Sequence, residues 1–583
     1  MFRQSTVWKF SFLGRSGMKS FAWIPPFVCF LIIIGTLIWA IPHGLDFTDE
    51  GFYLIHLTFP DRYPTLYGFG NIYQSALGWC CTNVIHWRNA KLVQGILGGM
   101  LFAITIVKLV PKPNAVASFW AVFCMNFVSF SLYLQTISYN DLNNFLVILS
   151  SIAVLWSLKL ESKITVFLLL LGGGICLGLN FFNKSTASFA MLGWTSLFLI
   201  SCHCFKFSAL RVSVWAQILA FLIGYFFGFC LFFALIKPFD LWIKDYLLGL
   251  EASATYMDSI GVWLGNYLKY LVRSVGFVVF LVLPWWAVGN KKKYKIWIIL
   301  FATLWILTGV YLTHLVLGGE KGFSKLALVY LTVIALQFVA IKDRLIAQKC
   351  SLHSFVNKHK EVLFIAFFLF IIPFACSLGS TNSLTRQASF HLIFWGGVIV
   401  ILNSISTNWQ SLPAVIGILV LVQITSGTLN PYAASATVNP KHPVTLQDQT
   451  VLLENIEVLR GLKLDATTAA SLLKIKFLTD SLSNFTDNQA IFFDLPALNY
   501  LTATQSPGTD WFYFLYEPHN KYIISKLKLK TLPLLGILNH RKPGELTQKS
   551  LGKIGIKMDK YVKVGSFSFP TQSDTLQLYA PRR

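Results

Sequence analysis

The sequence predicts a polytopic α-helical membrane protein with about thirteen transmembrane helices and a C-terminal extracytoplasmic α/β domain. Hydrophobic residues make up 55% of the 583 residues and charged residues only 13%, against about 25% charged residues in a typical soluble domain. Apolar runs such as 21–41, 212–236 and 296–317 approach or exceed the ~20 residues that cross a bilayer core. A more polar segment of mixed pattern follows the last apolar run, and it predicts the soluble domain.

The first apolar run predicts an uncleaved membrane anchor. Basic residues precede it, Arg3, Lys9, Arg15 and Lys19, as they do in a signal peptide. The apolar part is too long for a signal peptide, and no small-residue cleavage site follows before Pro42. We therefore count this run as the first span.

The remaining apolar runs predict the rest of the bundle. The expected spans are 21–42, 89–109, 115–134, 142–158, 164–182, 186–204, 212–236, 272–289, 296–316, 325–341, 362–378, 389–406 and 411–427. Lys and Arg gather in alternate loops, for example in "KKKYK" at 291–295, which predicts a cytoplasmic N-terminus by the positive-inside rule. An odd number of spans then places the C-terminus outside. These loops account for the formal charge of +23, so no nucleic-acid partner is expected.

The composition changes after Thr428, where "LNPYAASATVNPKHPV" predicts a linker. We expect a transmembrane domain at 1–428 and a periplasmic α/β domain at 429–583. Within the latter, Ala469–Thr479 has a helical pattern and "AIFFDL" is typical of a strand. In the membrane part, the glycines of "LGGGICLGL" favour close helix packing. The ten Cys show no disulfide framework.

The stretch "LDFTDEGFYLIHL", Leu45–Leu57, is the most informative part of the chain. It holds Asp46, Asp49 and Glu50 within five positions, although the whole chain has only 25 acidic residues. Its apolar spacing predicts a short helix at the membrane interface, with the acids at its N-terminus. Capping alone would explain one or two of them, at about 0.3–1 kcal/mol each, and Asp46 is the strongest candidate for that role. A general base or a metal ligand is the functional alternative.

Charged residues at other outside junctions extend this pattern. Asp141 stands where an outside loop enters a span, and Lys184 lies at an outside turn between two spans. The outside turn "SLGSTNSLTRQASF", at 377–390, combines Thr381 and Asn382 with Arg386. Hydroxyls and an Arg fork suit a phosphate. Capping by Asp141, snorkelling by Lys184 and an ordinary loop at 377–390 are the structural alternatives.

Together, these residues place carboxylates and cations on one membrane face. An ionised carboxylate can deprotonate an acceptor, and cations can stabilise the charge that grows on a departing phosphate. This combination suits a donor whose leaving group is a lipid-linked phosphate. Arg88, at the end of the first outside loop, is a further candidate for substrate binding.

The order of these features resembles the GT-C superfamily of integral-membrane glycosyltransferases, especially protein O-mannosyltransferases and lipid A aminoarabinose transferases. "TDEGFYL" is similar to the first-loop Asp-Glu motif of that branch, which implies a catalytic Asp49 beside Glu50. "NDLNNFLVI" resembles a segment whose acid matches Asp141. "GLNFFNKSTA" resembles one whose phosphate-side lysine matches Lys184.

Two further segments carry the resemblance. "GSTNSLTRQ" is similar to a "GTNN" loop of some bacterial members and contains Thr381, Asn382 and Arg386. "FFDLPALNYLTATQSPGTDWF" resembles a soluble tail segment that usually reads "D-x-P-G", where this chain has Ala497 in place of Gly.

The resemblance implies an inverting glycosyltransferase with Asp49 as general base, and the predicted topology places its site on the periplasmic face. The lack of eukaryotic sorting signals favours a bacterial inner membrane. The expected donor is a polyprenyl-phosphate sugar, and the acceptor is a glycan, a lipid or a protein. No cofactor is firmly predicted, although the three acids could hold Mg²⁺ or Mn²⁺. The main alternative is a multi-pass transporter or lipid flippase, which would need ionisable residues near the middle of its spans. A sensor or scaffold with an outer domain is a third reading.

Overall fold

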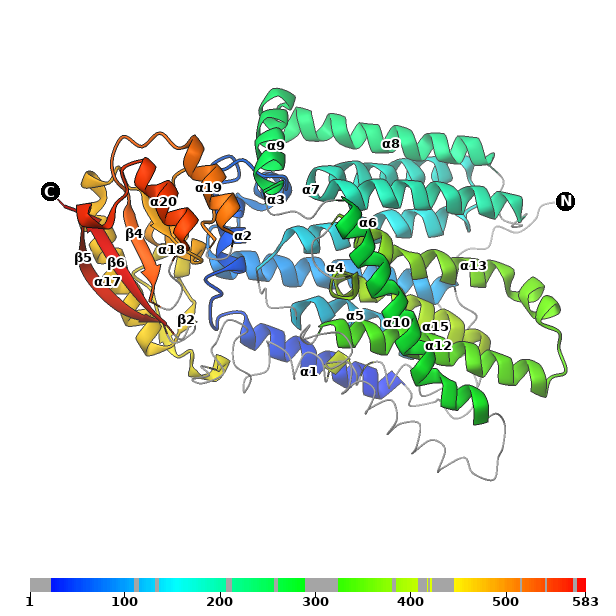
Figure 1. Cartoon of the computed structure of the whole chain (residues 1–583). Helices are drawn as coiled ribbons and strands as arrows, with labels where there is room; N and C mark the ends of the chain where they lie inside the picture. Colours follow the sequence, from blue (N-terminus) through cyan, green and yellow to red (C-terminus); the bar gives the residue numbers. More distant parts are fainter. Residues whose placement is uncertain are drawn as a thin grey trace.

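The computed structural model describes residues 23–109, 115–131, 136–205, 212–255, 260–288, 323–379, 384–406, 417, 420–421, 445–513, 516–539, 543–569 and 574–582. Figure 1 shows a bundle of long helices with a small α/β domain at one end, and this domain carries the C-terminus. The described strands all lie after residue 450. The chain is therefore mostly helical, with a small C-terminal sheet domain.

The bundle and its connections contain the described helices α1 (Ile24–Ala40), α2 (Asp49–Thr58), α3 (Phe69–Leu77), α4 (Val84–Leu109), α5 (Ala115–Met125), α6 (Tyr139–Ser157), α7 (Lys163–Cys204), α8 (Val214–Leu235), α9 (Phe239–Ser253), α10 (Ile260–Val288), α12 (Phe323–Ala347), α13 (Leu352–Cys376), α14 (Leu384–Ala388) and α15 (Leu392–Ser406). Two 3-10 segments, η2 (Asn126–Ser131) and η4 (Ser389–His391), lie among them.

Five of the described helical runs are long and apolar enough to cross a membrane. They are α4, α7, α8, α13 and the run Leu384–Ile405, which joins α14, η4 and most of α15. Helices α1 and α5 are apolar but shorter. Membrane association is thus supported, whereas the expected count of about thirteen spans is not confirmed. The expected span 296–316 lies outside the described residues, as does all of 411–427 except residues 417, 420 and 421.

Helix α7 reverses its direction at Lys184. The backbone there is non-helical, with φ −150° and ψ 82°. The Ser188 hydroxyl donates to the Leu177 carbonyl at 2.6 Å, although residues eleven apart in a straight helix are separated by about 16 Å. The two halves of α7 are therefore antiparallel, and Lys184 occupies the turn that the sequence predicted for it.

Glycines allow α7 and α8 to pack with their backbones in contact. A Cβ atom at Gly174 would lie 2.1 Å from the Phe221 carbonyl oxygen, and one at Gly178 would lie 2.1 Å from that of Tyr225. No real Cβ atom approaches an oxygen so closely, so any side chain would force the helices apart. The packing role expected for "LGGGICLGL" is confirmed.

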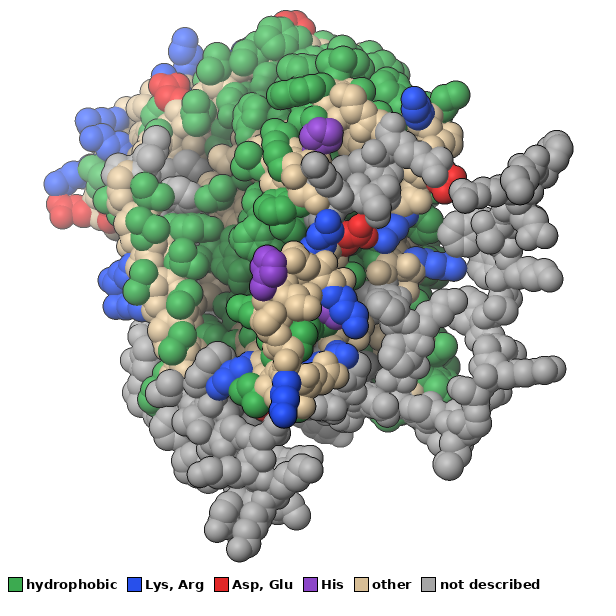
Figure 2. Space-filling model, turned by 90° about the vertical axis from the view of Figure 1, so that its right-hand side faces the viewer, with side chains coloured by type: hydrophobic (Ala, Val, Ile, Leu, Met, Phe, Trp, Pro, Cys, Tyr) green, Lys and Arg blue, Asp and Glu red, His purple; other side chains and the backbone are tan. Residues whose placement is uncertain are grey.

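The bundle end away from the C-terminal domain is basic. Helices α4, α6 and α12 end there, close to Lys108, Lys159 and Arg344, and α13 begins there, near Lys358. Figure 2 looks onto this end and shows Lys and Arg side chains around a largely apolar surface, with few acidic side chains. The described part of this end of the bundle is therefore basic.

The C-terminal domain is built from the described elements β1 (Val451–Leu452), β2 (Lys463–Leu464), α17 (Ala466–Leu482), β3 (Ala490–Phe492), α18 (Pro496–Thr502), α19 (Glu517–Lys526), β4 (Leu534–Leu538), α20 (Glu545–Lys553), β5 (Tyr561–Phe569) and β6 (Asp574–Pro581). The helix expected at Ala469–Thr479 falls within α17. The strand expected from "AIFFDL" corresponds to β3.

The main sheet of this domain has the order β3-β4-β6-β5. Strands β3 and β4 are parallel, and the other neighbouring pairs are antiparallel. Phe492 and Leu534 belong to a buried cluster with residues of α17 and α18, whereas Ile491 and Leu535 belong to one with residues of α19 and α20. Helices therefore cover both faces of β3 and β4, which explains why these strands are apolar at nearly every position.

The C-terminal domain packs directly on α2. The backbone N–H of Ala497, the first turn of α18, donates to the Phe47 carbonyl at 3.1 Å. A Cβ atom at Gly51 would lie 2.3 Å from the Ala497 nitrogen, so only glycine permits this approach. Leu54 of α2 and Leu498 of α18 share one buried cluster. The acidic stretch is consequently fixed against the C-terminal domain.

Candidate active site

The Glu50 carboxylate is fully engaged inside the protein. Arg88 donates to it twice, from Nε to Oε1 at 2.9 Å and from Nη2 to Oε2 at 2.8 Å. The Thr136 hydroxyl also donates to Oε1, and the Asp46 backbone N–H donates to Oε2 at 3.1 Å. Burial raises the pKa of Glu50, but the charge of Arg88 and these hydrogen bonds outweigh burial and hold the pKa below its ordinary value.

Arg88 acts as a clamp on the chain before α2. Its remaining guanidinium N–H groups donate to the carbonyls of Ile41 at 2.6 Å and Gly44 at 2.8 Å. Arg88 and Glu50 are each only 1% exposed. These contacts give Arg88 a structural role and hold the Glu50 carboxylate in place. The substrate contact expected for Arg88 and the catalytic role expected for Glu50 stay predictions.

Asp46 organises the turn that leads into α2. Its Oδ1 accepts from the Thr48 backbone N–H at 2.9 Å and from the Thr48 hydroxyl at 2.7 Å. Thr48 is the N-cap residue of α2, so Asp46, two residues before it, holds the N-cap residue in place. Burial, followed by the negative charge of Asp49, raises the pKa of Asp46 to about 7.

Asp49 differs from both of its acidic neighbours. It is the first residue of α2, it is half-buried, and it lines a cavity. Among the described residues, no hydrogen bond reaches its carboxylate. Burial raises the pKa of Asp49, and the positive charge of Arg386, from α14, opposes this rise. A carboxylate with a raised pKa that is open to a cavity is suited to accept a proton from a bound molecule.

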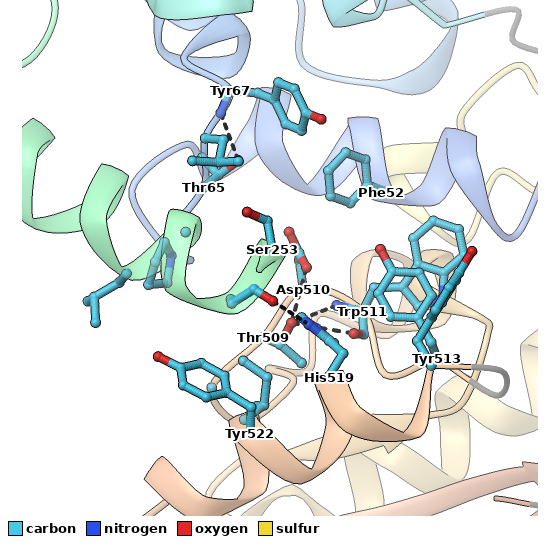
Figure 3. Close-up of a pocket in the computed structure, with 18 of the residues that line it drawn as sticks. Phe52, Thr65, Tyr67, Ser253, Thr509, Asp510, Trp511, Tyr513, His519 and Tyr522 are labelled. Carbon is cyan, nitrogen blue, oxygen red and sulfur yellow. Dashed lines mark hydrogen bonds between the residues drawn. The ribbon is translucent and has the colours of Figure 1, made fainter. Parts of the chain in front are cut away.

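The cavity beside Asp49 has a volume of about 650 Å³ and lies between the bundle and the C-terminal domain. Aromatic rings form much of its wall, including Phe52, Tyr67, Trp511 and Tyr513. Figure 3 shows Phe52 and Tyr67 on the bundle side, facing the aromatic residues of the C-terminal domain. A concave site with many rings and a few polar groups is the usual form of a small-molecule site.

The turn at 508–511 brings the C-terminal domain into this cavity. Asp510 Oδ2 lies 2.5 Å from His56 Nε2 of α2, and the Trp511 Nε1–H donates to Asp494 Oδ1 at 3.4 Å. The Ser506 N–H donates to the Tyr63 hydroxyl at 3.0 Å. The sequence assigned no site role to this turn. An acid beside an aromatic residue in "GTDW" was the available signal.

Lys184 is buried at the turn of α7, and its Nζ donates to Gln387 Oε1 of α14 at 3.1 Å. This burial is not that of a snorkelling lysine. The neighbouring loop is held here by Gly379, with φ +77°, where a Cβ atom would lie 2.1 Å from Thr186 Oγ1. The structure thus brings Lys184 and the segment of Arg386 together, as the sequence suggested.

A second cavity, of about 680 Å³, opens between helices of the bundle. Its wall is almost entirely apolar and comes from α10, α12, α13 and α15, together with Leu384, Thr385 and Ala388 of α14. Helix α14 therefore contributes to this apolar cavity and also carries Arg386, whose charge acts on Asp49.

Asp141 caps helix α6. Its Oδ2 accepts from the Ser138 N–H at 2.9 Å and from the Ser138 hydroxyl at 2.6 Å, and the Asp141 N–H donates back to that hydroxyl at 3.3 Å. This is a reciprocal capping box. Lys91 Nζ lies 3.4 Å from the same carboxylate. Capping, the structural alternative for this residue, accounts for the contacts with Ser138, and the ion pair with Lys91 adds to them.

Two of the sequence candidates, Thr381 and Asn382, lie outside the described residues. The described residues contain no group of three or more His, Cys, Asp or Glu placed to hold a metal ion. In particular, Asp46, Asp49 and Glu50 do not converge on one point, because Glu50 is turned towards Arg88.

Comparisons of this chain with protein-family models, curated proteins and solved structures found no match.

Proposed function

We propose that this protein is an inverting glycosyltransferase that uses a polyprenyl-phosphate-linked sugar and acts on the periplasmic face of the membrane. One arrangement carries this proposal: the short helix α14 lines the apolar cavity of the bundle and also bears Arg386, whose positive charge acts on Asp49, the open carboxylate of the aromatic cavity. The GT-C resemblance of the sequence agrees with this function.

The order of these parts matches the order of groups in such a donor. Thr385 and Ala388 line the apolar cavity, which suits a polyprenyl tail. Arg386 lies between them in sequence, and Gln387 next to it holds Lys184. Two cations near α14 suit the phosphate. The sugar would then lie in the aromatic cavity, beside Asp49.

In the proposed reaction, Asp49 accepts the proton of the acceptor hydroxyl while the acceptor oxygen forms a bond to the anomeric carbon. The bond between that carbon and the phosphate oxygen breaks, and the polyprenyl phosphate leaves as an anion. Arg386 and Lys184 stabilise the charge on this anion. No second carboxylic acid is needed, in contrast to glycoside hydrolysis, because phosphate is already a stable leaving group.

The basic end of the bundle supports the membrane orientation of this proposal. Its basic end would face the cytoplasm, and the C-terminal domain would then be periplasmic, in a bacterial inner membrane. The alternative function, transport or lipid flipping, would need charges deep in the spans. The ion pairs Arg88–Glu50 and Lys91–Asp141 instead lie in the first two turns of α4, on the side of α2.

Reconstitution tests this proposal directly. The purified full chain should release polyprenyl phosphate from a panel of radiolabelled polyprenyl-phosphate sugars when membrane extract is supplied as acceptor. Asp49→Asn should lower turnover by about 10²–10⁴-fold, as expected for loss of a general base. Asp240→Asn, an exposed acid in the first turn of α9, is the matched control and should not change turnover. Wild-type turnover by Asp49→Asn would show that the proposed mechanism is wrong.

A further inference from the structure

We infer that the C-terminal domain binds a carbohydrate ring of the acceptor, and that it does so by stacking this ring on the wall formed by Trp511, Tyr513 and Tyr516, here called the aromatic wall. The inference rests on the proposed transferase function, because it names the acceptor class of the same site. The aromatic wall lines the cavity that Asp49 also lines.

The aromatic wall consists of a stacked pair of rings and a third ring set across one of them. The rings of Trp511 and Tyr513 are stacked, with their centroids 4.8 Å apart and their planes inclined by 17°. Tyr516 stands nearly perpendicular to Tyr513, at 5.3 Å and 89°, and is 47% exposed. Figure 3 shows the stacked rings of Trp511 and Tyr513 on the C-terminal-domain side of the cavity.

The chemistry of this wall suits a sugar ring. One face of a pyranose consists of C–H groups, which are attracted to the electron-rich face of an aromatic ring. Hydroxyls at the ring's rim need hydrogen-bond acceptors, and Asp494, Asp510 and the Thr509 hydroxyl line the same cavity. The cavity therefore offers aromatic rings for the C–H face of a sugar and hydrogen-bond acceptors for its hydroxyls.

A peptide acceptor fits the described part of this wall less well. An extended peptide binds by adding main-chain hydrogen bonds to an open strand or edge. Here the Phe512 carbonyl already accepts from the Asp494 N–H at 2.9 Å, and the Tyr513 N–H donates to Asn520 Oδ1 at 3.1 Å. The surface offered by these residues therefore consists of ring faces and side-chain acids.

The aromatic wall is also adjacent to the proposed base. Phe52 lies one turn after Asp49 on α2, a spacing that places the two side chains on one face of the helix. The Phe52 ring is 6.1 Å from that of Trp511, and the contact between His56 and Asp510 fixes α2 to the turn that carries Trp511. A sugar held on the wall would therefore present its hydroxyls near Asp49.

Saturation-transfer NMR on the purified full chain in detergent tests the inference. The probes are methyl glycosides of glucose, galactose and N-acetylglucosamine, and a Ser/Thr-containing tripeptide serves as the rival probe. At least one glycoside should bind, and Trp511→Ala should weaken its affinity about threefold to tenfold, the range expected for loss of an aromatic contact. Trp511→Phe should restore part of it. Phe477→Ala, which removes an exposed aromatic residue of α17 away from the cavity, should leave binding and turnover unchanged.

Should Trp511→Ala fail to fold, Tyr516→Ala truncates the wall at an exposed position. In transfer assays, the wall variants should raise the acceptor KM more than they lower kcat. If the chain turns over a lipid donor and binds the tripeptide but no glycoside, the inference is wrong and the proposed function stands. Glycoside binding that depends on Trp511 in a chain that turns over no lipid donor would retain the carbohydrate site and refute the transferase.

Discussion

Replacing Glu50 with Gln separates a positioning role from a catalytic one. Glu50 and Arg88 are each 1% exposed and share two hydrogen bonds at 2.8 and 2.9 Å. Loss of one partner from such a pair leaves a buried, uncompensated charge, and this typically costs 3–5 kcal/mol. Because Gln keeps one oxygen that can accept from Arg88 and Thr136, we expect Glu50→Gln to lower the free energy of unfolding by about 3 kcal/mol, the lower end of this range.

The measurement is the thermal unfolding midpoint of the purified chain, combined with turnover per folded molecule. Glu50→Gln should lower the midpoint clearly and reduce turnover less than Asp49→Asn does. The double variant Glu50→Gln/Arg88→Met should recover part of the lost stability, because the buried guanidinium is then also removed. The Asp49 carboxylate receives no hydrogen bond from the described residues, so Asp49→Asn should unfold near the wild-type midpoint.

One result would refute this reasoning. If Glu50→Gln unfolded at the wild-type midpoint and yet lost as much turnover as Asp49→Asn, Glu50 would act in the chemistry itself. The clamp with Arg88 would then not be what positions α2.

Three further outcomes are expected. The pKa of Asp46 is raised from 3.8 to about 7, so the folded chain keeps a proton that the unfolded chain releases. The contribution of Asp46 to the free energy of unfolding therefore falls as pH rises from 4 to 7, by up to about 4 kcal/mol. Asp46→Asn should reduce this fall, as measured by unfolding midpoints at pH 5 and 8. Arg386→Ala should lower donor turnover without loss of membrane insertion, and Arg386→Lys should restore only part, since a point charge cannot replace a bidentate fork. Gly51→Val should separate the C-terminal domain from α2, because a Cβ atom there meets Ala497 at 2.3 Å, and limited proteolysis should then release this domain.

Local patterns in the sequence were sufficient to predict several features. The acids at the start of a helix at 49–58, the turn at Lys184 and the glycine contacts of α7 all follow from periodicity or residue size. Each depends on residues within one or two neighbouring elements. The capping alternative for Asp141 is equally local, since it needs only Ser138.

The remaining site contacts depend on long-range packing, which no single stretch encodes. Glu50 meets Arg88 across 38 positions, and His56 meets Asp510 across 454 positions. Nothing in the local pattern around Arg88 distinguishes a clamp from a substrate contact. For the same reason the C-terminal wall of the cavity was missed, because its role exists only once this domain is docked on α2.

Asp46, Asp49 and Glu50 show how one short stretch can place three carboxyl groups in three different environments. On a helix, consecutive residues point about 100° apart, so Glu50 turns towards Arg88 while Asp49 faces the cavity. The pKa of Glu50 is lowered by its cation, whereas burial raises the pKa values of Asp46 and Asp49. Asp46 is in turn committed to Thr48. Neighbouring carboxylates whose pKa values are pushed apart in this way have distinct tasks. Of the three, Asp49 alone combines a raised pKa with access to the cavity and no hydrogen bond from the described residues, so the proton transfer of the proposed reaction falls to Asp49.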